Sequence, residues 1–413
     1  MRAVLGLYRD AFGGLPRLTW LLCAAAFLNR CGSMVVPFLG PYLKAKFGLA
    51  AADAGLVVSL YGVGAILGSW LGGALTDRIG PVRLQVGALT ASASWMLLMT
   101  QCATLATLVP AIFVLGLLND AFRPGSNTAV AQSVPPHLRR KALSLNRFAL
   151  NLGWACGPTI GGHLVELDFV WMFVADGATC ALAAFWLAQV LRQWAPVAGA
   201  AASEAAAEAA AEAATAAPAP AAASPWRDGH FVRLMVANTF VLLAFMQYFA
   251  TGTRVFVDQG WGEADVGWFL AVNPILIALF EMPAVHALRA RKTLPAIAVG
   301  ALVIGLGYLC FLLPWGGLAI VLGMAVVAGG ELLQMPMLGA HVNDVAPDRA
   351  RGAYNGAYGV NFTFALVLAP ALGGLVYDRF GADALWCSCA GMGAIGALLF
   401  AAEAARARRS TAV

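Results

Sequence analysis

Residues 153–162 read Gly-Trp-Ala-Cys-Gly-Pro-Thr-Ile-Gly-Gly, and residues 365–374 read Ala-Leu-Val-Leu-Ala-Pro-Ala-Leu-Gly-Gly. In both stretches a small residue recurs every four positions, and a proline precedes a glycine pair. Because residues four apart lie on one face of a helix, each stretch predicts a helix with a face that almost lacks side chains. Such a face lets a second helix approach closely, which suits a gate that must seal and part; close packing without a gating role is the alternative.

The two stretches belong to a longer internal repeat with an offset of 212 residues. Each copy reads as a proline-containing helix, a basic loop and a helix that ends in the glycine pair. The same offset pairs Pro124 with Pro336, Pro135 with Pro347 and Arg139 with Arg351. We interpret the chain as two parallel halves of six helices with a site at their interface, which is a transporter architecture.

The composition places these helices in a membrane. Apolar residues make up 61% of the 413 residues, charged residues make up 11%, and the mean hydropathy is +0.76. These values exclude a soluble enzyme, a disordered protein and a disulfide-stapled secreted module, because a soluble domain could not hydrate such a surface. Apolar runs of about twenty residues fit membrane-crossing helices and not the alternating strands of a membrane β-barrel.

We therefore predict an all-α polytopic membrane protein with twelve transmembrane helices. The eight cysteines fall mostly inside apolar runs, where we expect small buried side chains. The predicted spans are residues 18–43, 53–75, 82–102, 104–131, 141–165, 169–191, 231–256, 265–287, 294–313, 317–342, 353–376 and 384–403.

The distribution of basic residues predicts the orientation of the chain. With the N-terminus in the cytoplasm, most of the 26 lysine and arginine residues fall in cytoplasmic loops or tails. The outer side receives only Lys44, Lys46, Arg254 and Arg379. This asymmetry follows the positive-inside rule and predicts that both termini are cytoplasmic.

Between the sixth and seventh spans the composition changes to mostly Ala, Pro and Glu. We interpret this stretch as a cytoplasmic tether, since its charges exclude a further span. The predicted parts are an N-terminal six-helix bundle at 1–192, a linker at 193–229 and a C-terminal six-helix bundle at 230–413.

The loop between the second and third spans reads Gly73-Ala-Leu-Thr-Asp77-Arg78-Ile-Gly80-Pro-Val-Arg83. It resembles the cytoplasmic-loop motif of the major facilitator superfamily. Apart from the linker, the whole chain resembles the twelve-helix drug/proton antiporters of that superfamily. The resemblance implies gating roles for Gly73, Asp77, Arg78, Gly80 and Arg83, whose charged members latch the two halves on the cytoplasmic side. A plain topogenic loop is the alternative.

Two further motifs carry the resemblance. Residues 32–41 are similar to the first-helix motif of the same group, and residues 153–162 fit its fifth-helix motif. The fifth-helix motif implies gating roles for Gly153, Gly157, Pro158, Gly161 and Gly162. The fourth span departs from the pattern, because Ile112 stands where the family carries an arginine and the arginine of this span is Arg123.

Seven ionisable residues that we single out lie inside predicted spans, where each costs at least about 2.5–3.5 kcal/mol and needs a reason. Glu331 lies near the middle of the tenth span, without a basic residue one turn away in the sequence. Because low dielectric favours the protonated carboxyl, we predict Glu331 as a proton carrier, with Asp120 and Glu281 as further candidates for a relay. Neutral, hydrogen-bonded core residues are the alternative. The seven residues are Arg30, Asp120, Arg123, Arg147, Asp176, Glu281 and Glu331.

These charges predict a polarised cavity, since the first half supplies most of the positive charge and the second half supplies carboxylates. Asp120 and Arg123 stand three apart on one helix and can also pair with each other. We expect an anionic or zwitterionic part of a substrate to lie toward Arg30 and Arg123. Aromatic and amide residues that could complete the site, although such residues also serve in packing, are Asn29, Tyr61, Asn127, Gln247, Asn273, Gln334 and Asn361.

Motifs that the sequence lacks narrow the function further. There is no G-x-x-x-x-G-K-[ST], and the five histidines show no H-E-x-x-H. We therefore expect neither ATP hydrolysis nor metal chemistry, no enzyme activity, and no cofactor other than the proton gradient.

These observations together predict a monomeric, proton-coupled secondary transporter in the inner membrane of a bacterium. Its expected partners are a small-molecule substrate, protons and the lipid bilayer, and not nucleic acid. Our first interpretation is export by antiport of a small amphiphilic, anionic or zwitterionic molecule through alternating access. The alternatives are a symporter or facilitator that imports a metabolite, siderophore or peptide-like solute, a lipid flippase of the same fold, and a membrane sensor.

Overall fold

The computed structural model describes residues 12–192, 194, 224–288, 293–347 and 350–410. Most of the predicted linker, at 195–223, lies outside these ranges, so its interpretation as a tether stays a prediction.

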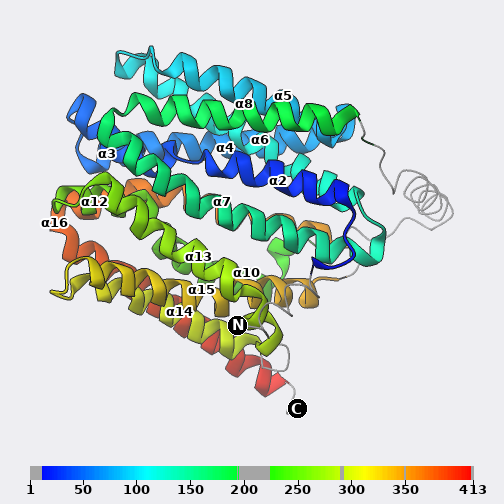
Figure 1. Cartoon of the computed structure of the whole chain (residues 1–413). Coiled ribbons are helices and arrows are strands. Elements are labelled where there is room, and N and C mark those ends of the chain that lie inside the picture. The colour runs from blue at the N-terminus through cyan, green and yellow to red at the C-terminus, as the bar shows by residue number, and fades with distance from the viewer. Residues whose placement is uncertain (1–11, 193, 195–223, 289–292, 348–349, 411–413) are drawn as a thin grey trace. The chain divides into compact units, whose positions relative to one another are not determined.

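Helices occupy each of the first six predicted spans (Figure 1). The first span is interrupted after Cys31, and a second helix resumes at Val35. The helices are α2 (Arg17–Cys31), α3 (Val35–Phe47), α4 (Ala51–Ile79), α5 (Pro81–Met99), α6 (Leu105–Gln132), α7 (Arg139–Leu167) and α8 (Val170–Arg192).

Helices also occupy the six predicted spans of the second half. The seventh span is built from three successive helices, and the eleventh and twelfth form one long element that is interrupted at Gly381, where φ is 83°. The helices are α10 (Gly229–Phe245), α11 (Gln247–Ala250), α12 (Gly252–Asp258), α13 (Glu263–Leu288), α14 (Thr293–Leu309), α15 (Gly317–Val345) and α16 (Arg351–Ser410).

Length and apolarity qualify most of these helices to cross a membrane. In the part of the chain that the structure describes, nine segments meet both criteria, and the segment in α16 covers two predicted spans. The chain therefore has the all-α polytopic membrane fold that its sequence predicts.

Contacts between residues divide the chain into two compact units. The first unit comprises residues 1–33, 63–154 and 173–222, and the second comprises 34–62, 155–172 and 223–413. The second unit thus takes in parts of α4 and α7 together with the whole of α3. The division into two six-helix halves stays a prediction.

Within the first unit, glycines bring two helices into contact. Gly64, Gly68 and Gly72 of α4 lie against the backbone of α6, and a Cβ added at Gly68 would overlap the carbonyl of Leu117. Because these glycines recur every four residues, they form one face of α4. Side chains on that face would force the two helices apart.

Within the second unit, α14 packs between α15 and α16, and Figure 1 shows the three elements side by side. A buried aromatic cluster lies near one end of these helices. The indole of Trp386 stacks on Phe256 and on Tyr308, with ring centroids 5.7 Å and 6.0 Å away, and meets the edge of Phe311. This cluster ties α12, α14 and α16 together.

The glycine face of α4 yields a prediction about stability. We expect Gly68→Ala to lower the midpoint of thermal unfolding of the detergent-solubilised protein by several degrees, since the new methyl group overlaps the backbone of α6. Gly87 of α5 faces open space, so Gly87→Ala should be neutral or stabilise by up to about 1 kcal/mol through helix propensity. Equal effects of the two substitutions would contradict this account of the α4–α6 contact.

Candidate functional site

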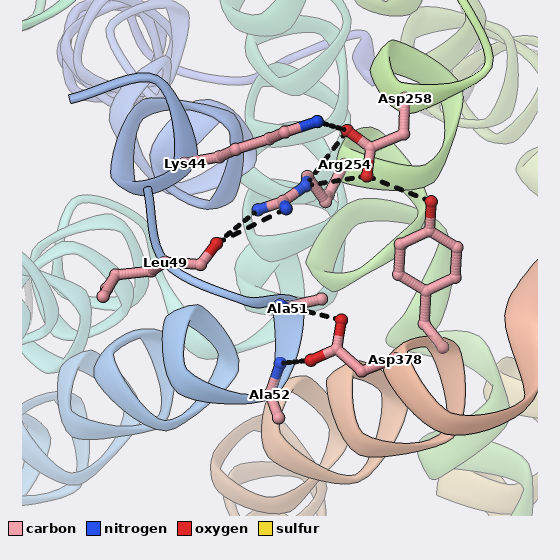
Figure 2. A network of polar contacts seen from close by, with 8 residues as sticks. Lys44, Leu49, Ala51, Ala52, Arg254, Asp258 and Asp378 are labelled. Carbon is pink, nitrogen blue, oxygen red and sulfur yellow. Dashed lines mark hydrogen bonds and ion pairs between the residues drawn. The ribbon is translucent and has the colours of Figure 1, made fainter. Parts of the chain in front are cut away.

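The N-terminus of α4 is capped by a carboxylate from α16. The backbone amide of Ala51 donates to Oδ1 of Asp378 at 3.0 Å, and that of Ala52 donates to Oδ2 at 2.6 Å (Figure 2). The first amides of a helix have no acceptor within the helix, and the helix dipole favours a negative charge beside them. Asp378 satisfies both needs from a different part of the chain.

Glycines make this approach of α4 and α16 geometrically feasible. A Cβ at Gly55 would overlap the carbonyl of Pro370, and a Cβ at Gly374 would overlap the carbonyl of Ala51. The Pro-x-x-Gly-Gly string of α16 thus lies directly against the start of α4. Gly374 stands one position after the four-residue face of Ala365, Ala369 and Gly373, so the neighbouring side of the helix makes this contact.

The other copy of the string makes the corresponding contact with α13. The carboxylate of Glu166, on α7, accepts a hydrogen bond from the amide of Ala264 at 3.1 Å. A Cβ at Gly267 would overlap the carbonyl of Pro158, and a Cβ at Gly162 would overlap the carbonyl of Glu263. Both Pro-x-x-Gly-Gly strings therefore make the same kind of backbone contact within the second unit.

A cluster of charged side chains lies beside the α4–α16 contact (Figure 2). Nζ of Lys44 lies 2.6 Å from Oδ1 of Asp258, and Nε of Arg254 lies 2.9 Å from Oδ2 of the same carboxylate. The Tyr377 hydroxyl donates to Asp258 at 3.0 Å. Arg254 also donates to the carbonyl of Leu49, at 3.3 Å and 3.4 Å. The cluster therefore joins α3 and the segment before α4 to α12 and α16.

The central pair of this cluster is nearly buried. Side-chain exposure is 9% for Arg254 and 15% for Asp258, against 48% for Lys44. Asp258 lies beyond the apolar segment that ends at Ala250. Burial alone would raise the pKa of its carboxyl, but hydrogen bonds from Lys44 and Arg254 outweigh burial and lower the pKa below its ordinary value. The carboxylate therefore stays charged and holds both cations.

Sequence reasoning did not single out Asp258, Asp378 or Glu166. One signal could have found the charge cluster, because Lys44 and Arg254 are among the few basic residues that break the positive-inside pattern. The carboxylate of Asp258 gives these two basic residues a structural reason to depart from the predicted pattern.

The predicted proton carrier Glu331 lies on α15, where Nδ2 of Asn273 on α13 donates to its carboxylate at 3.1 Å. Two residues from the predicted set are thus in contact. Glu281, the second carboxylate of this half, lies half-buried on α13, two residues before Pro283. The assignment of Glu331 as the proton carrier stays a prediction.

Two other predicted substrate residues belong to a buried amide network. Nε2 of Gln334 donates to Asn238 at 2.8 Å, and Nδ2 of Asn238 donates to Asn361 at 2.6 Å. Asn361 in turn donates to Thr239 at 2.6 Å. The network joins α10, α15 and α16 and gives partners to most of its buried amide groups, while Oε1 of Gln334 is left without a hydrogen bond.

The remaining predicted residues of the second unit lie at the small-residue faces or near them. Nε2 of Gln247 donates to the carbonyl of Ala369 at 2.8 Å, and Tyr61 on α4 is buried. Gly157 and Gly161 are buried on α7, and a Cβ at Gly161 would lie 2.8 Å from the Cβ of Met34.

In the first unit, the guanidinium of Arg30 lies over the ring of Trp154, 4.7 Å from its centroid. A Cβ at Gly153 would lie only 2.6 Å from the Cβ of Arg30, so the absence of a side chain at Gly153 leaves room for Arg30. Arg123 and Asp120 form the ion pair that their spacing predicts, at 3.8 Å, and Arg30 also attracts the charge of Asp120. Three of the predicted charges therefore lie together.

The other first-unit residues contact polar neighbours or solvent. Asn29 accepts a hydrogen bond from Sγ of Cys180 at 3.6 Å, and Asn127 accepts one from Asn146 at 3.2 Å. In the loop motif, Gly80 has a φ of 87°, a conformation that favours glycine, while Gly73 has open space around it. The charged residues of this motif are all exposed, namely Asp77, Arg78 and Arg83.

Within the described residues, no three His, Cys, Asp or Glu side chains come together in a way that could hold a metal ion. The polar arrangement can instead hold helix ends, pair charges and exchange protons.

The lowered pKa of Asp258 yields a pH-dependent prediction. At pH 7 we expect Asp258→Asn to cost about 1–3 kcal/mol, because Arg254 loses its charged acceptor. A carboxyl with a lowered pKa stabilises the folded chain above its unfolded pKa, and this stability is lost as the pH falls through the folded value. The difference between wild type and Asp258→Asn in thermal unfolding should thus be complete at pH 6–7 and shrink below about pH 4.

Asp383, which is exposed on α16, provides the matched control for this charge change. Asp383→Asn should leave the unfolding midpoint nearly unchanged at every pH. A gap between wild type and Asp258→Asn that widens as the pH falls would contradict the expected sign.

The chain matches known transporters over most of its length. Residues 22–359 and 255–412 match the Major Facilitator Superfamily. The uncharacterised MFS-type transporter YqjV of Bacillus subtilis (strain 168) is 25% identical over 373 residues, covering 88% of this chain and 87% of the relative. The Na(+), Li(+), K(+)/H(+) antiporter of Planococcus maritimus is 25% identical over 375 residues, covering 83% of this chain and 85% of the relative.

A solved structure gives the same result for the fold. The structure of peptide transporter POT in complex with sulfate superimposes with a TM-score of 0.77 at 18% identity, over 96% of each chain. At this identity the likeness shows the fold and not the substrate. With the sequence match across the helices and the shared fold, the chain belongs to the Major Facilitator Superfamily and is a transporter, not an enzyme.

Proposed function

We propose that this transporter exchanges protons for a small amphiphilic, anionic or zwitterionic molecule and exports that molecule from the cytoplasm through alternating access. The proposal includes an inner-membrane location, cytoplasmic termini and a monomeric chain. Its energy source is the proton gradient, and its partners are protons, the substrate and the bilayer.

One observation carries the proposal, namely the Glu331 carboxylate with its hydrogen bond from Asn273. Glu331 lies in the apolar helix α15, and the 3.1 Å contact joins it to α13. A carboxylate is costly inside a membrane and marks proton relays in transporters. Because an amide can donate to a carboxylate and accept from a carboxylic acid, Asn273 can serve both protonation states of Glu331. Proton gain and loss can then shift how α13 and α15 pack.

The relative from Planococcus maritimus supports the exchange of protons against another solute. Its name gives Na(+), Li(+), K(+)/H(+) antiport, and it matches this chain at 25% identity over 375 residues. From this relative we infer antiport for this chain, and we do not infer that the chain transports the same ions.

The first unit supports a negatively charged group on the substrate. Arg30 lies over the Trp154 ring at 4.7 Å, and the side chain of Arg123 is 59% exposed although Asp120 lies 3.8 Å away. An exposed guanidinium can bind a carboxylate or phosphate group in bidentate geometry. Asp120 can offer its own charge to the cationic end of a zwitterion.

The proton role of Glu331 can be tested by substitution. A thermal-shift screen of anionic and zwitterionic compounds at pH 6 and pH 8 first identifies a ligand. In proteoliposomes with an imposed pH gradient, Glu331→Gln should then lose gradient-driven transport by at least about ten-fold and retain counterflow of the same ligand. Counterflow needs alternating access and no net proton movement, so it separates coupling from folding.

Glu281→Gln is the comparison variant, because it makes the same chemical change on α13. We expect it to reduce gradient-driven transport less than Glu331→Gln does. Full pH-driven transport by Glu331→Gln would refute the proposed carrier. Uptake along the inward proton gradient, in place of exchange against it, would favour the symporter, and movement of labelled lipid would favour the flippase.

The anion-binding role of the arginines makes a separate prediction. Arg30→Ala and Arg123→Ala should each weaken binding of the anionic ligand by about ten-fold or more, since each removes a charge-assisted contact. Arg147→Ala provides a control on another intramembrane arginine, for which we propose no substrate contact. Unchanged affinity in both test variants, measured by isothermal titration, would remove the anionic substrate class from the proposal.

A further inference from the structure

The internal repeat relates the capping carboxylates of α4 and α13 and an amide that each of them accepts. The offset of 212 residues converts Glu166 into Asp378 and Ala52 into Ala264. It also relates the backbone contacts, since the approach of α13 to Pro158 at Gly267 corresponds to the approach of α4 to Pro370 at Gly55. The second unit thus contains one interaction twice, with the roles of the two repeats exchanged.

Each cap differs from an ordinary helix cap in where its carboxylate comes from. An N-cap residue usually precedes its own helix and stays beside it whatever else moves. Asp378 and Glu166 instead come from segments more than 95 residues distant in the sequence from the amides that they accept. Such a cap exists only while the two segments are in contact, so it stabilises the contact and not merely the helix.

We propose that Asp378 and Glu166 are paired latches. They hold closed the end of the second unit at which α4 and α13 begin, and they open together. The proposal rests on the proposed function, because alternating access requires this end to open during the cycle. When it opens, the first amides of α4 and α13 lose their acceptors at the same time. Their recapture by the two carboxylates then restores the closed state.

The two latches differ in the number of hydrogen bonds that each carboxylate accepts. Asp378 accepts from two amides, at 3.0 Å and 2.6 Å, whereas Glu166 accepts from Ala264 at 3.1 Å. The charge cluster around Asp258 also strengthens only the first latch through Tyr377, the residue next to Asp378. The repeat does not duplicate this cluster, since the positions that correspond to Lys44, Asp258, Arg254 and Tyr377 are Phe256, Lys46, Tyr42 and Val165.

Hydrogen–deuterium exchange of the full-length protein in detergent, without ligand, tests this inference. Asp378→Ala should speed exchange by about five-fold at the N-terminus of α4 and also at the N-terminus of α13, which it does not contact. Glu166→Ala should speed exchange at the same two places by a smaller factor. Asp378→Asn keeps one acceptor for the α4 amides, so its effect should lie between those of wild type and Asp378→Ala.

Asp228 provides the matched control, because it caps α10 from the position directly before that helix, with amides of His230 at 2.9 Å and Phe231 at 3.2 Å. The hydroxyl of Tyr354 on α16 also donates to Asp228, so Asp228→Ala should speed exchange at the start of α10 and near Tyr354, and not at the starts of α4 and α13. If Asp378→Ala speeds exchange at α4 and leaves α13 unchanged, the carboxylates are independent caps and the proposal is overturned. Should the alanine variants fail to fold, Asp378→Asn and Glu166→Gln provide the same comparison.

The exchange experiment needs neither substrate nor a proton gradient. If the transport experiment refutes the proton role of Glu331, the result of the exchange experiment therefore still stands. Conversely, if the N-termini of α4 and α13 open independently in the exchange experiment, the paired latches are refuted and the proton-coupling experiment is unaffected.

Discussion

The first backbone amides of α4 and α13 need acceptors, and the chain supplies them from distant segments. Water can satisfy such amides at an exposed helix end, but an end packed against another helix has to find a protein acceptor. The carboxylates of Asp378 and Glu166 reach these amides only because the glycines of the Pro-x-x-Gly-Gly strings leave space for the approaching backbone. The most conspicuous motif of the sequence and the capped helix ends are therefore two aspects of one requirement.

The sequence predicts the helices and their small-residue faces because both follow from local patterns. Apolar runs of membrane-spanning length place the spans, and the four-residue spacing in α7 predicts a close approach, which Gly153 makes to the carbonyl of Phe27. The glycines that follow the two series, Gly162 and Gly374, approach a backbone from the neighbouring side of each helix. The partners of those faces could not be predicted, because Ala51 and Glu263 have nothing distinctive in their local sequence. The glycine face at Gly64, Gly68 and Gly72 carries the same spacing and could have been found by the same argument.

The candidate site shows where local patterns stop being informative. Gln334 and Asn361 have the composition of substrate-binding residues, yet in the structure they donate to Asn238 and Thr239. A buried amide needs partners whether or not a substrate provides them, so its presence in a span cannot distinguish binding from internal hydrogen bonding. The pairing of Arg123 with Asp120 was predictable, since both lie within one helical turn. The pairing of Lys44 with Asp258 spans 214 residues and depends on tertiary structure.

The carboxylates of the chain differ in their neighbours, and these neighbours decide which role each carboxylate can have. Asp258 faces the cations of Lys44 and Arg254, which lower its pKa and keep it charged over the pH range of a living cell. A group that never gains a proton in that range cannot carry one, but it can hold a contact steadily while the proton gradient changes. Glu331 is joined to the neutral amide of Asn273, which tolerates either protonation state. A transporter that couples protons to movement needs both kinds of carboxylate, and in the mechanism that we propose Asp258 holds its contact steadily while Glu331 gains and loses the proton.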